Sequence, residues 1–200
     1  MLVIPKRLID LLITVPGLAA VAPVMIVAAL MVKFGDGGPV FFRQTRVGRG
    51  GRPFAIWKFR TFVCAAEAAG LPITIGSDPR ITRTGQYLRR YKIDELPQLF
   101  NVLAGDMSLV GPRPEVPCIV ATYGPEQRKV LEYLPGITDP ASIEYRNEAE
   151  LLGRSSDPRR EYLENILPRK LAINLDYASR AGAISDLRVI LRTVCTIFTR

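Results

Sequence analysis

The stretch KIDELPQLFNVL, residues 92–103, is the segment around which the rest of the chain is organised. From Leu96 onward its apolar residues recur at spacings of three and four, which predicts a short amphipathic helix. Pro97 is tolerated only in the first turn, because its ring removes a backbone N–H that a later turn would need. The helix is therefore predicted to begin at about Asp94 to Leu96, which puts Asp94 and Glu95 at its positive end, where a negative charge is stabilised by roughly 0.3–1 kcal/mol.

Two interpretations of this acidic pair remain open from the segment alone. In the first, Asp94 and Glu95 only cap the helix, since acidic residues are common in first turns. In the second, the two carboxylates take part in catalysis. Arg89, Arg90 and Lys92 lie just upstream, and such cations are expected to keep both acids ionised and to attract a polyanion.

The composition points to phosphate-bearing partners. A chain of 200 residues suggests one domain with room for a hydrophobic core, and a formal charge of +8 favours the phosphates of lipids, nucleotides or nucleic acid. Histidine is absent, which excludes histidine bases and imidazole metal ligands. The cysteines at 64, 118 and 195 lack zinc-site spacing and are expected to be reduced thiols in a cytoplasmic setting.

A long apolar segment runs from Leu8 to Val32 after a basic start. As a straight helix it would measure about 37 Å, enough to cross a hydrocarbon core of about 30 Å. A signal peptide fits the basic start, but Pro23 would directly follow the candidate cleavage site at residues 20–22, and the apolar run continues beyond it. A simple spanning helix remains the ordinary alternative.

We favour a third interpretation, a helix that enters the bilayer, bends and leaves on the same side. Pro16 and Pro23 each remove a helical hydrogen bond, and a break at Pro23 leaves arms of about 15 and 9 residues that are too short to cross. Both ends of the segment are cationic, so charge favours sending neither end outward. Asp10 is expected to pair with Lys6 or Arg7 one turn earlier.

A β-hairpin is predicted after the glycine-rich breaker at residues 35–39. Residues 40–47 and 54–61 are rich in aromatic and β-branched side chains. The connector at 48–53 matches neither dinucleotide nor P-loop spacing, so a plain turn is favoured over a phosphate loop. Six cations in this region either form a solvated face or bind anionic lipid headgroups, at about 1 kcal/mol each. They are Arg43, Arg46, Arg49, Arg52, Lys58 and Arg60.

The remaining segments complete a mixed α+β fold, within the α/β class. Residues 64–75 are expected to run from a helix into a loop, and residues 85–92 to form a helix. A helical stretch at 159–178 is expected to be interrupted at Pro168. A last amphipathic helix, beginning at Asp186, either packs on the domain or lies in the membrane interface. The predicted architecture is thus a re-entrant membrane helix, a small β-hairpin or sheet, and amphipathic interfacial helices.

The stretch GDMSLVGPRPE, residues 105–115, continues from the acidic helix. Together the two stretches resemble, almost letter for letter, the small monotopic phosphoglycosyl transferases of the bacterial sugar transferase family, which are undecaprenyl-phosphate sugar phosphotransferases. KFRTF at 58–62 and LPGIT at 134–138 are also similar to motifs of this family, although Phe62 stands where methionine is common. The resemblance covers nearly the whole chain.

The resemblance implies transfer of a phosphosugar from a UDP-sugar to a polyprenyl (undecaprenyl) phosphate, with release of UMP, as the first membrane step of glycan or exopolysaccharide assembly. It implies that Asp94 attacks the β-phosphorus to form an aspartyl-phosphosugar, and that Glu95, with Asp94, binds Mg²⁺. The sequence leaves open which of the two carboxylates faces the phosphorus. The implied phosphate- or nucleotide-binding side chains are Lys58, Arg60, Arg113 and Arg146.

The resemblance also implies a location at the bacterial inner (cytoplasmic) membrane. Residues 1–34 would form the re-entrant membrane helix, broken at Pro23 and in contact with membrane lipids, and residues 35–200 a membrane-associated catalytic domain on the cytoplasmic face. The family's proline is usually preceded by serine, where this chain has Ala22. Larger relatives carry additional membrane helices before this core, whereas here the core is expected to begin at once.

One segment departs from the family pattern. Residues 139–148 read DPASIEYRNE, where many relatives carry GWAQ and then NGR, so the sugar is not identified. Asp139 and Glu144 add negative charge there, which suits hydroxyl recognition better than phosphate contact.

Two other classes of protein compete with the enzyme. A non-catalytic, basic membrane-surface adaptor that binds anionic lipids would leave the acidic pair dispensable. A nucleic-acid-binding protein is suggested by the charge alone. No recognition motif supports it and the apolar start argues against it, so we expect no nucleic acid as a partner.

Overall fold

The structure, a computed structural model, describes residues 6–63 and 78–199. It combines helices with two separate two-stranded sheets, which confirms the mixed α+β fold. The segment predicted at residues 64–75, which includes Cys64, lies outside the described residues. Cys118 and Cys195 are free and exposed, as expected for reduced thiols.

The elements follow in chain order. The helices are α1 (Lys6–Asp36), α2 (Arg83–Arg90), α3 (Gln98–Ala104), α4 (Pro117–Val120), α5 (Pro125–Arg128), α6 (Pro140–Glu144), α7 (Glu148–Gly153), α8 (Pro158–Glu161), α9 (Leu167–Ser179) and α10 (Ala183–Phe198). The shorter turns are the 3₁₀ segments η1 (Arg49–Gly51), η3 (Ile93–Glu95) and η4 (Lys129–Glu132), and the π-helical turn η5 (Tyr162–Ile166). The strands are β1 (Phe41–Val47), β2 (Pro53–Phe59), β3 (Ser108–Val110) and β4 (Gly136–Thr138).

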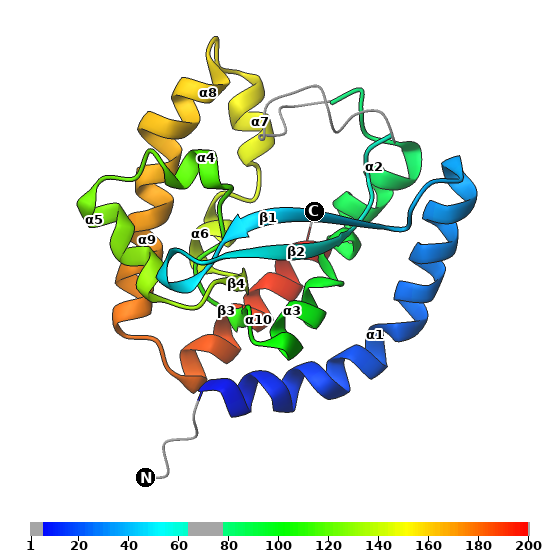
Figure 1. Cartoon of the computed structure of the whole chain (residues 1–200), viewed down its shortest axis with the longest axis horizontal. Coiled ribbons are helices and arrows are strands. Elements are labelled where there is room, and N and C mark those ends of the chain that lie inside the picture. The colour runs from blue at the N-terminus through cyan, green and yellow to red at the C-terminus, as the bar shows by residue number, and fades with distance from the viewer. Residues whose placement is uncertain (1–5, 64–77, 200) are drawn as a thin grey trace.

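Helix α1 is one continuous helix of 31 residues that changes direction along its length. In Figure 1 it runs along the lower edge of the molecule and then up its right side. Pro16 and Pro23 both lie inside it, and prolines are the usual cause of such bends. Helix α1 is therefore not interrupted at Pro23 and continues to Asp36.

Much of the apolar surface of α1 faces away from the rest of the protein, although Met25, Ala28 and Val32 are buried in a cluster with Phe59 and Leu88. By length and composition the helix is able to cross a membrane, and the mean hydropathy of its most apolar 18-residue stretch is 2.3. Only 11% of that stretch is buried. This low burial distinguishes α1 from the core helix of a soluble protein. The exposed apolar side chains are Leu8, Leu12, Val15, Val24, Ile26, Val27, Leu30, Met31 and Phe34.

The basic start of α1 is bound to protein groups. Lys6 forms an ion pair with Asp186 in the first turn of α10, with 2.5 Å between Nζ and Oδ2. Arg7 donates hydrogen bonds to the main-chain carbonyls of Val102 and Leu103. Because the last carbonyls of a helix lack partners within it, the Arg7 guanidinium acts as a C-terminal cap of α3.

Asp10 attaches the next turn of α1 to strand β3. Its Oδ1 accepts hydrogen bonds from Ser108 Oγ at 3.0 Å and from the Leu109 N–H at 3.1 Å. The expected pairing of Asp10 with Lys6 or Arg7 is therefore wrong, because both cations are bound elsewhere and the carboxylate points into the domain.

The predicted hairpin is confirmed. Strands β1 and β2 pair antiparallel, with Phe41 opposite Phe59, and η1 forms the turn between them. The cations at the turn are exposed, whereas Arg46, Lys58 and Arg60 are largely buried. The basic run is thus divided by the alternation of the strands and does not form a single solvated face.

The second sheet fixes the segment that carries Arg113. Strands β3 and β4 pair in parallel. Directly after β3, Gly111 donates its N–H to the carbonyl of Thr138 in β4, and Gly136 in β4 donates to the Pro112 carbonyl, both at 3.0 Å. A Cβ on Gly136 would lie 2.1 Å from the Gly111 nitrogen. Only glycine allows this backbone contact, so the two loops are held against each other.

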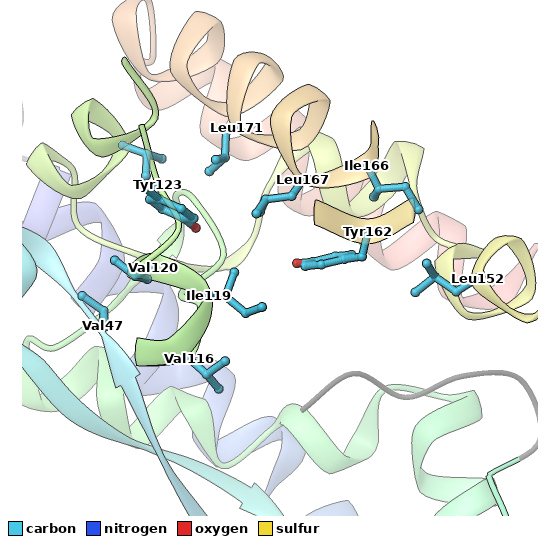
Figure 2. Close-up of a cluster of buried hydrophobic side chains, with 11 residues drawn as sticks. Val47, Val116, Ile119, Val120, Tyr123, Leu152, Tyr162, Ile166, Leu167 and Leu171 are labelled. Atoms are coloured by element: carbon cyan, nitrogen blue, oxygen red, sulfur yellow. The ribbon is translucent and has the colours of Figure 1, made fainter. Parts of the chain in front are cut away.

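The largest hydrophobic core lies between the far end of the hairpin, α4, η4 and the C-terminal helices (Figure 2). The stretch predicted at 159–178 is helical from α8 to α9, but Pro168 sits in the first turn of α9 and the irregular turn is η5, just before it. A proline cannot supply its own i→i−4 hydrogen bond, and the wider π turn accommodates that loss.

The other two predicted helices begin earlier than expected. Helix α2 starts at Arg83 because the Thr82 side chain accepts a hydrogen bond from the Gly85 N–H at 2.8 Å and caps it. Helix α10 starts at Ala183 and packs on the domain through buried residues such as Val189. Its remaining apolar surface is exposed at Ile184, Leu187, Leu191 and Val194.

Replacing Asp10 with alanine is expected to destabilise the protein, because it leaves the buried Ser108 hydroxyl and the Leu109 N–H without their acceptor. A hydrogen bond to a charged group contributes about 1.5–3 kcal/mol, so the melting temperature of the detergent-solubilised protein, followed by circular dichroism, should fall by several degrees. Lys33→Gln is the control. Lys33 lies near the other end of α1, is exposed, and in the described part of the chain donates to the Gly37 carbonyl. Equal melting temperatures for the two variants would contradict the anchoring role of Asp10.

Candidate active site

Asp94 and Glu95 lie in the 3₁₀ turn η3, and helix α3 begins only at Gln98, after Pro97. Pro97 has no N–H to donate to the Ile93 carbonyl, and the Leu96 N–H takes that carbonyl instead, at 3.1 Å. This i→i−3 bond tightens the turn into 3₁₀ geometry. The α-helix therefore begins two residues after the latest predicted start, Leu96, and the two acids precede α3 in a separate turn.

Glu95 is held by two cations from different parts of the chain. Its Oε1 lies 2.8 Å from Lys58 Nζ and 2.5 Å from one terminal nitrogen of Arg113, and its Oε2 lies 3.3 Å from the other. Lys58 comes from β2 and Arg113 from the loop after β3. This cluster brings together three of the side chains that the resemblance implies.

The charges in this cluster shift one another's pKa values. Burial raises the pKa of Glu95, but the positive charges of Arg113 and Lys58 outweigh it and hold that pKa well below its usual range. Burial lowers the pKa of Lys58, partly offset by the charge of Glu95. The pKa of Arg113 is raised by Glu95. Glu95 is therefore ionised across the physiological range and paired with at least one permanent cation.

Asp94 has a different environment although it is the adjacent residue. It is 6% exposed, and its Oδ1 has no hydrogen-bond partner among the residues that the structure describes. Burial, reinforced by the charge of Glu95, raises its pKa above the usual value. We expected the upstream cations to keep both acids ionised, but at Asp94 the burial outweighs the effects of Lys92 and Arg89.

Asn101 is a site residue that the sequence patterns did not single out. It is buried on α3, where its Oδ1 accepts from the Trp57 N–H at 3.0 Å and its Nδ2 donates to the Ala55 carbonyl at 2.8 Å. These bonds join α3 to the edge of β2 beside Lys58. One feature of the sequence could have identified Asn101: the amide side chains of Gln98 and Asn101 are spaced three residues apart and so share the buried face of an apolar helix.

For the other predicted site residues, the structure describes contacts outside the acidic pair. Arg60 is buried and its Nε donates to the Pro39 carbonyl at 2.8 Å, which supports the connection between α1 and β1. Arg146 is exposed between α6 and α7, and no contact within the described ranges joins it to the acidic pair. Asp139 is fully buried and caps α6 by accepting from the Ser142 N–H at 2.9 Å, so it is not available for the hydroxyl recognition that we expected.

The donor atoms fit a magnesium ion only in part. Residues 6–63 and 78–199 contain no group of three or more potential metal ligands. Mg²⁺ is, however, often held by one or two carboxylates together with substrate phosphates and water. The unpartnered Oδ1 of Asp94 meets that requirement, whereas both oxygens of Glu95 are engaged by Lys58 and Arg113.

Comparison with known proteins identifies the family. The family model described as bacterial sugar transferase matches residues 2–200. A UDP-glucose:undecaprenyl-phosphate glucose-1-phosphate transferase of Caulobacter vibrioides is 38% identical over 197 residues, which cover 97% of this chain and 70% of that protein. A UDP-N-acetylgalactosamine-undecaprenyl-phosphate N-acetylgalactosaminephosphotransferase of Aeromonas hydrophila is 34% identical over 200 residues, 97% of this chain and 44% of that protein.

A third relative, a UDP-glucose:undecaprenyl-phosphate glucose-1-phosphate transferase of Escherichia coli, is 34% identical over 197 residues, 94% of this chain and 39% of that protein. The chain thus spans less than half the length of the second and third relatives. Their names share the reaction type but differ in the sugar, so similarity alone does not identify the sugar for this chain. The chain belongs to the bacterial sugar transferase family and is a transferase.

Proposed function

We propose that this transferase moves a phosphosugar from a UDP-sugar to undecaprenyl phosphate, through a covalent intermediate on Asp94. The observation that carries the assignment is the difference between the two acids. Both oxygens of Glu95 are bound by Lys58 and Arg113, whereas Asp94 Oδ1 has no partner in the described chain. A nucleophile needs an uncommitted lone pair, so we assign attack to Asp94 and orientation to Glu95.

The substrates follow from the relatives, whose names specify UDP-sugars as donors and undecaprenyl phosphate as acceptor. In the first step, an Asp94 oxygen bonds to the β-phosphorus, and the bond from that phosphorus to the bridging oxygen breaks, so that UMP leaves with the electron pair. In the second step, an oxygen of the polyprenyl phosphate bonds to the same phosphorus and the Asp94 carboxylate leaves. The products are polyprenyl-diphosphate sugar and UMP.

Lys58 and Arg113 supply the positive charge that these steps need. The Arg113 backbone is restricted by the flanking prolines, and a guanidinium with a fixed main chain can bind a phosphate bidentately at low entropic cost. An incoming diphosphate would compete with Glu95 for both cations. We propose Asp94, and Glu95 once its cations have moved to the phosphates, as carboxylate ligands of a Mg²⁺ that neutralises the phosphate charge.

We further propose that the enzyme acts at the cytoplasmic face of the bacterial inner membrane, with α1 as a re-entrant helix. The exposed apolar residues of α1 and α10 support membrane contact, and the bend in α1 suits a helix that enters and leaves on one side. A polyprenyl acceptor keeps its phosphate at the lipid–water boundary, where the site must then lie. A non-catalytic lipid-binding adaptor gives no role to a buried carboxylate held between two cations.

The central test is to incubate the purified protein with a UDP-sugar radiolabelled in the sugar, in the presence of Mg²⁺ and without acceptor. The protein should become labelled and release UMP, and a panel of UDP-sugars would identify the donor. Asp94→Asn should lower UMP release by about 10³-fold or more, because an amide does not attack phosphorus at a useful rate.

Glu150→Gln is the control, since Glu150 is an exposed acid on α7 and should retain normal turnover. Normal UMP release by Asp94→Asn would reject the nucleophile assignment. Absence of transfer from every uridine diphosphosugar by folded wild-type protein would reject the proposed function.

The pH dependence of UMP release provides a second prediction. Attack needs the ionised form of Asp94, and because burial beside Glu95 raises its pKa, the rate should fall on acidification at a higher pH than for an ordinary aspartate. Lys58→Met removes a positive charge that lowers the pKa of Asp94, so the acid limb should move to still higher pH. Initial rates measured from about pH 4 to 9 give the limb directly.

Lys129→Met is the control for this shift, because Lys129 is exposed and, among the described residues, forms an ion pair with Glu126 in the same helical region. The position of its acid limb should match that of the wild type. An acid limb that stays in place in Lys58→Met would contradict the electrostatic link between Lys58 and Asp94, whatever the effect on the maximal rate.

A further inference from the structure

Glu115 lies two residues beyond Arg113 and is held from two directions. Tyr162 Oη donates a hydrogen bond to Glu115 Oε1 at 2.5 Å, and Arg46 forms an ion pair with Oε2 at 3.5 Å. The Glu115 carbonyl also accepts from the Val47 N–H at 2.9 Å. Glu115 therefore joins the end of the hairpin to the C-terminal helices.

Two further hydrogen bonds restrain the main chain on either side of Arg113. On the C-terminal side, Arg46 donates to the Pro114 carbonyl at 3.1 Å. On the N-terminal side, the Pro112 carbonyl accepts from the Gly136 N–H at 3.0 Å. The guanidinium that binds Glu95 thus extends from a backbone whose position is set by β4 on one side and by the Glu115 contacts on the other.

Tyr162 is the member of this arrangement that comes from farthest away in the chain. It is 3% exposed and opens the π-helical turn η5, and Lys170 Nζ lies 5.5 Å from the centre of its ring. Figure 2 shows its hydroxyl pointing into the space between this turn and α4. Burial raises the pKa of Tyr162, so the hydroxyl keeps its proton and remains a hydrogen-bond donor to Glu115.

We propose that Tyr162 is a positioning residue for Arg113, acting through Glu115. This inference rests on the proposed function, in which Arg113 binds phosphate oxygens in both steps. A bidentate contact depends on the angle and position of the guanidinium, and small displacements of a binding group can reduce rates by about 10²-fold. The segment that carries Tyr162 would then set the geometry of the active site through Glu115.

Tyr177 offers a matched control. Its hydroxyl also donates to a buried carboxylate, Asp186 Oδ1 at 2.6 Å, and it too lies in the C-terminal helices. That carboxylate is joined to Lys6, so the hydrogen bond connects α9, α10 and α1. Tyr162→Phe and Tyr177→Phe each remove one buried hydroxyl–carboxylate bond, but only the first acts on the loop that carries Arg113.

The kinetic test measures turnover at saturating UDP-sugar and acceptor, per folded molecule. Tyr162→Phe should lower kcat by about 10-fold, and Tyr177→Phe should stay within about 2-fold of the wild type. In an Arg113→Lys background, Tyr162→Phe should cause little further loss, because the group that it positions is already gone. Equal kcat values for the two tyrosine variants, or full multiplication of the Tyr162 and Arg113 effects, would overturn the proposal.

A second measurement does not depend on turnover. In ¹⁵N-labelled full-length protein in detergent micelles, the Arg113 Nε resonance can be assigned from its loss in Arg113→Lys. It should shift and broaden in Tyr162→Phe, and in Glu115→Gln as a second variant, but not in Tyr177→Phe. An unchanged Arg113 resonance in both variants would overturn the positioning role. If the Arg113 resonance changes in these variants but the wild-type protein transfers no phosphosugar, the positioning role is retained and the proposed function is rejected.

Discussion

The structure depends on one buried ion-pair cluster, in which Glu95 is held between Lys58 and Arg113. Taking charges out of water costs several kcal/mol per ion, and their mutual attraction recovers this only with good geometry and further hydrogen bonds. The cluster therefore does not act mainly to stabilise the fold. It joins β2, η3 and the loop after β3, and it holds together the two cations that we propose to bind phosphate. In the absence of a diphosphate, the Glu95 carboxylate satisfies both cations.

The cluster also explains how two adjacent acids take different roles. Glu95 and Asp94 have nearly the same intrinsic acidity, so their local environments decide the difference. The two cations hold the pKa of Glu95 down, while burial and the neighbouring negative charge raise that of Asp94. Glu95 is thus a permanently charged carboxylate, whereas Asp94 has an oxygen without a hydrogen-bond partner in the described chain. The sequence left this assignment open because the order of two acids in a chain does not reveal which one the cations contact.

The features that sequence predicted well are those encoded locally. The hairpin follows from two aromatic and β-branched runs around a glycine-rich connector, and the long first helix follows from its apolar composition. Lys58, Glu95 and Arg113 were singled out by resemblance, and the structure brings them together from three separate segments.

The predictions that failed concern contacts between residues far apart in the chain. Asp10 was expected to pair within its own helix, but its partners are Ser108 and Leu109. The charge of Asp139 suggested an exposed, hydroxyl-binding loop, whereas the side chain is buried as a helix cap. The periodicity of a sequence does not reveal which distant residues become partners. An acidic residue also looks the same in the sequence whether it caps a helix, forms an ion pair or binds a ligand.

The same long-range contacts connect the proposed membrane helix to the chemistry. Arg7 binds the last carbonyls of α3, the helix that follows the two acids, and Asp10 binds the start of β3, the strand that leads to Arg113. Both sides of the ion-pair cluster are therefore attached to the first turns of α1. If α1 lies in the bilayer as we propose, its depth also sets the height of Asp94 above the lipid. A rigid attachment would suit an acceptor whose phosphate stays at the membrane surface, because the proposed nucleophile must lie at the same position in both proposed steps.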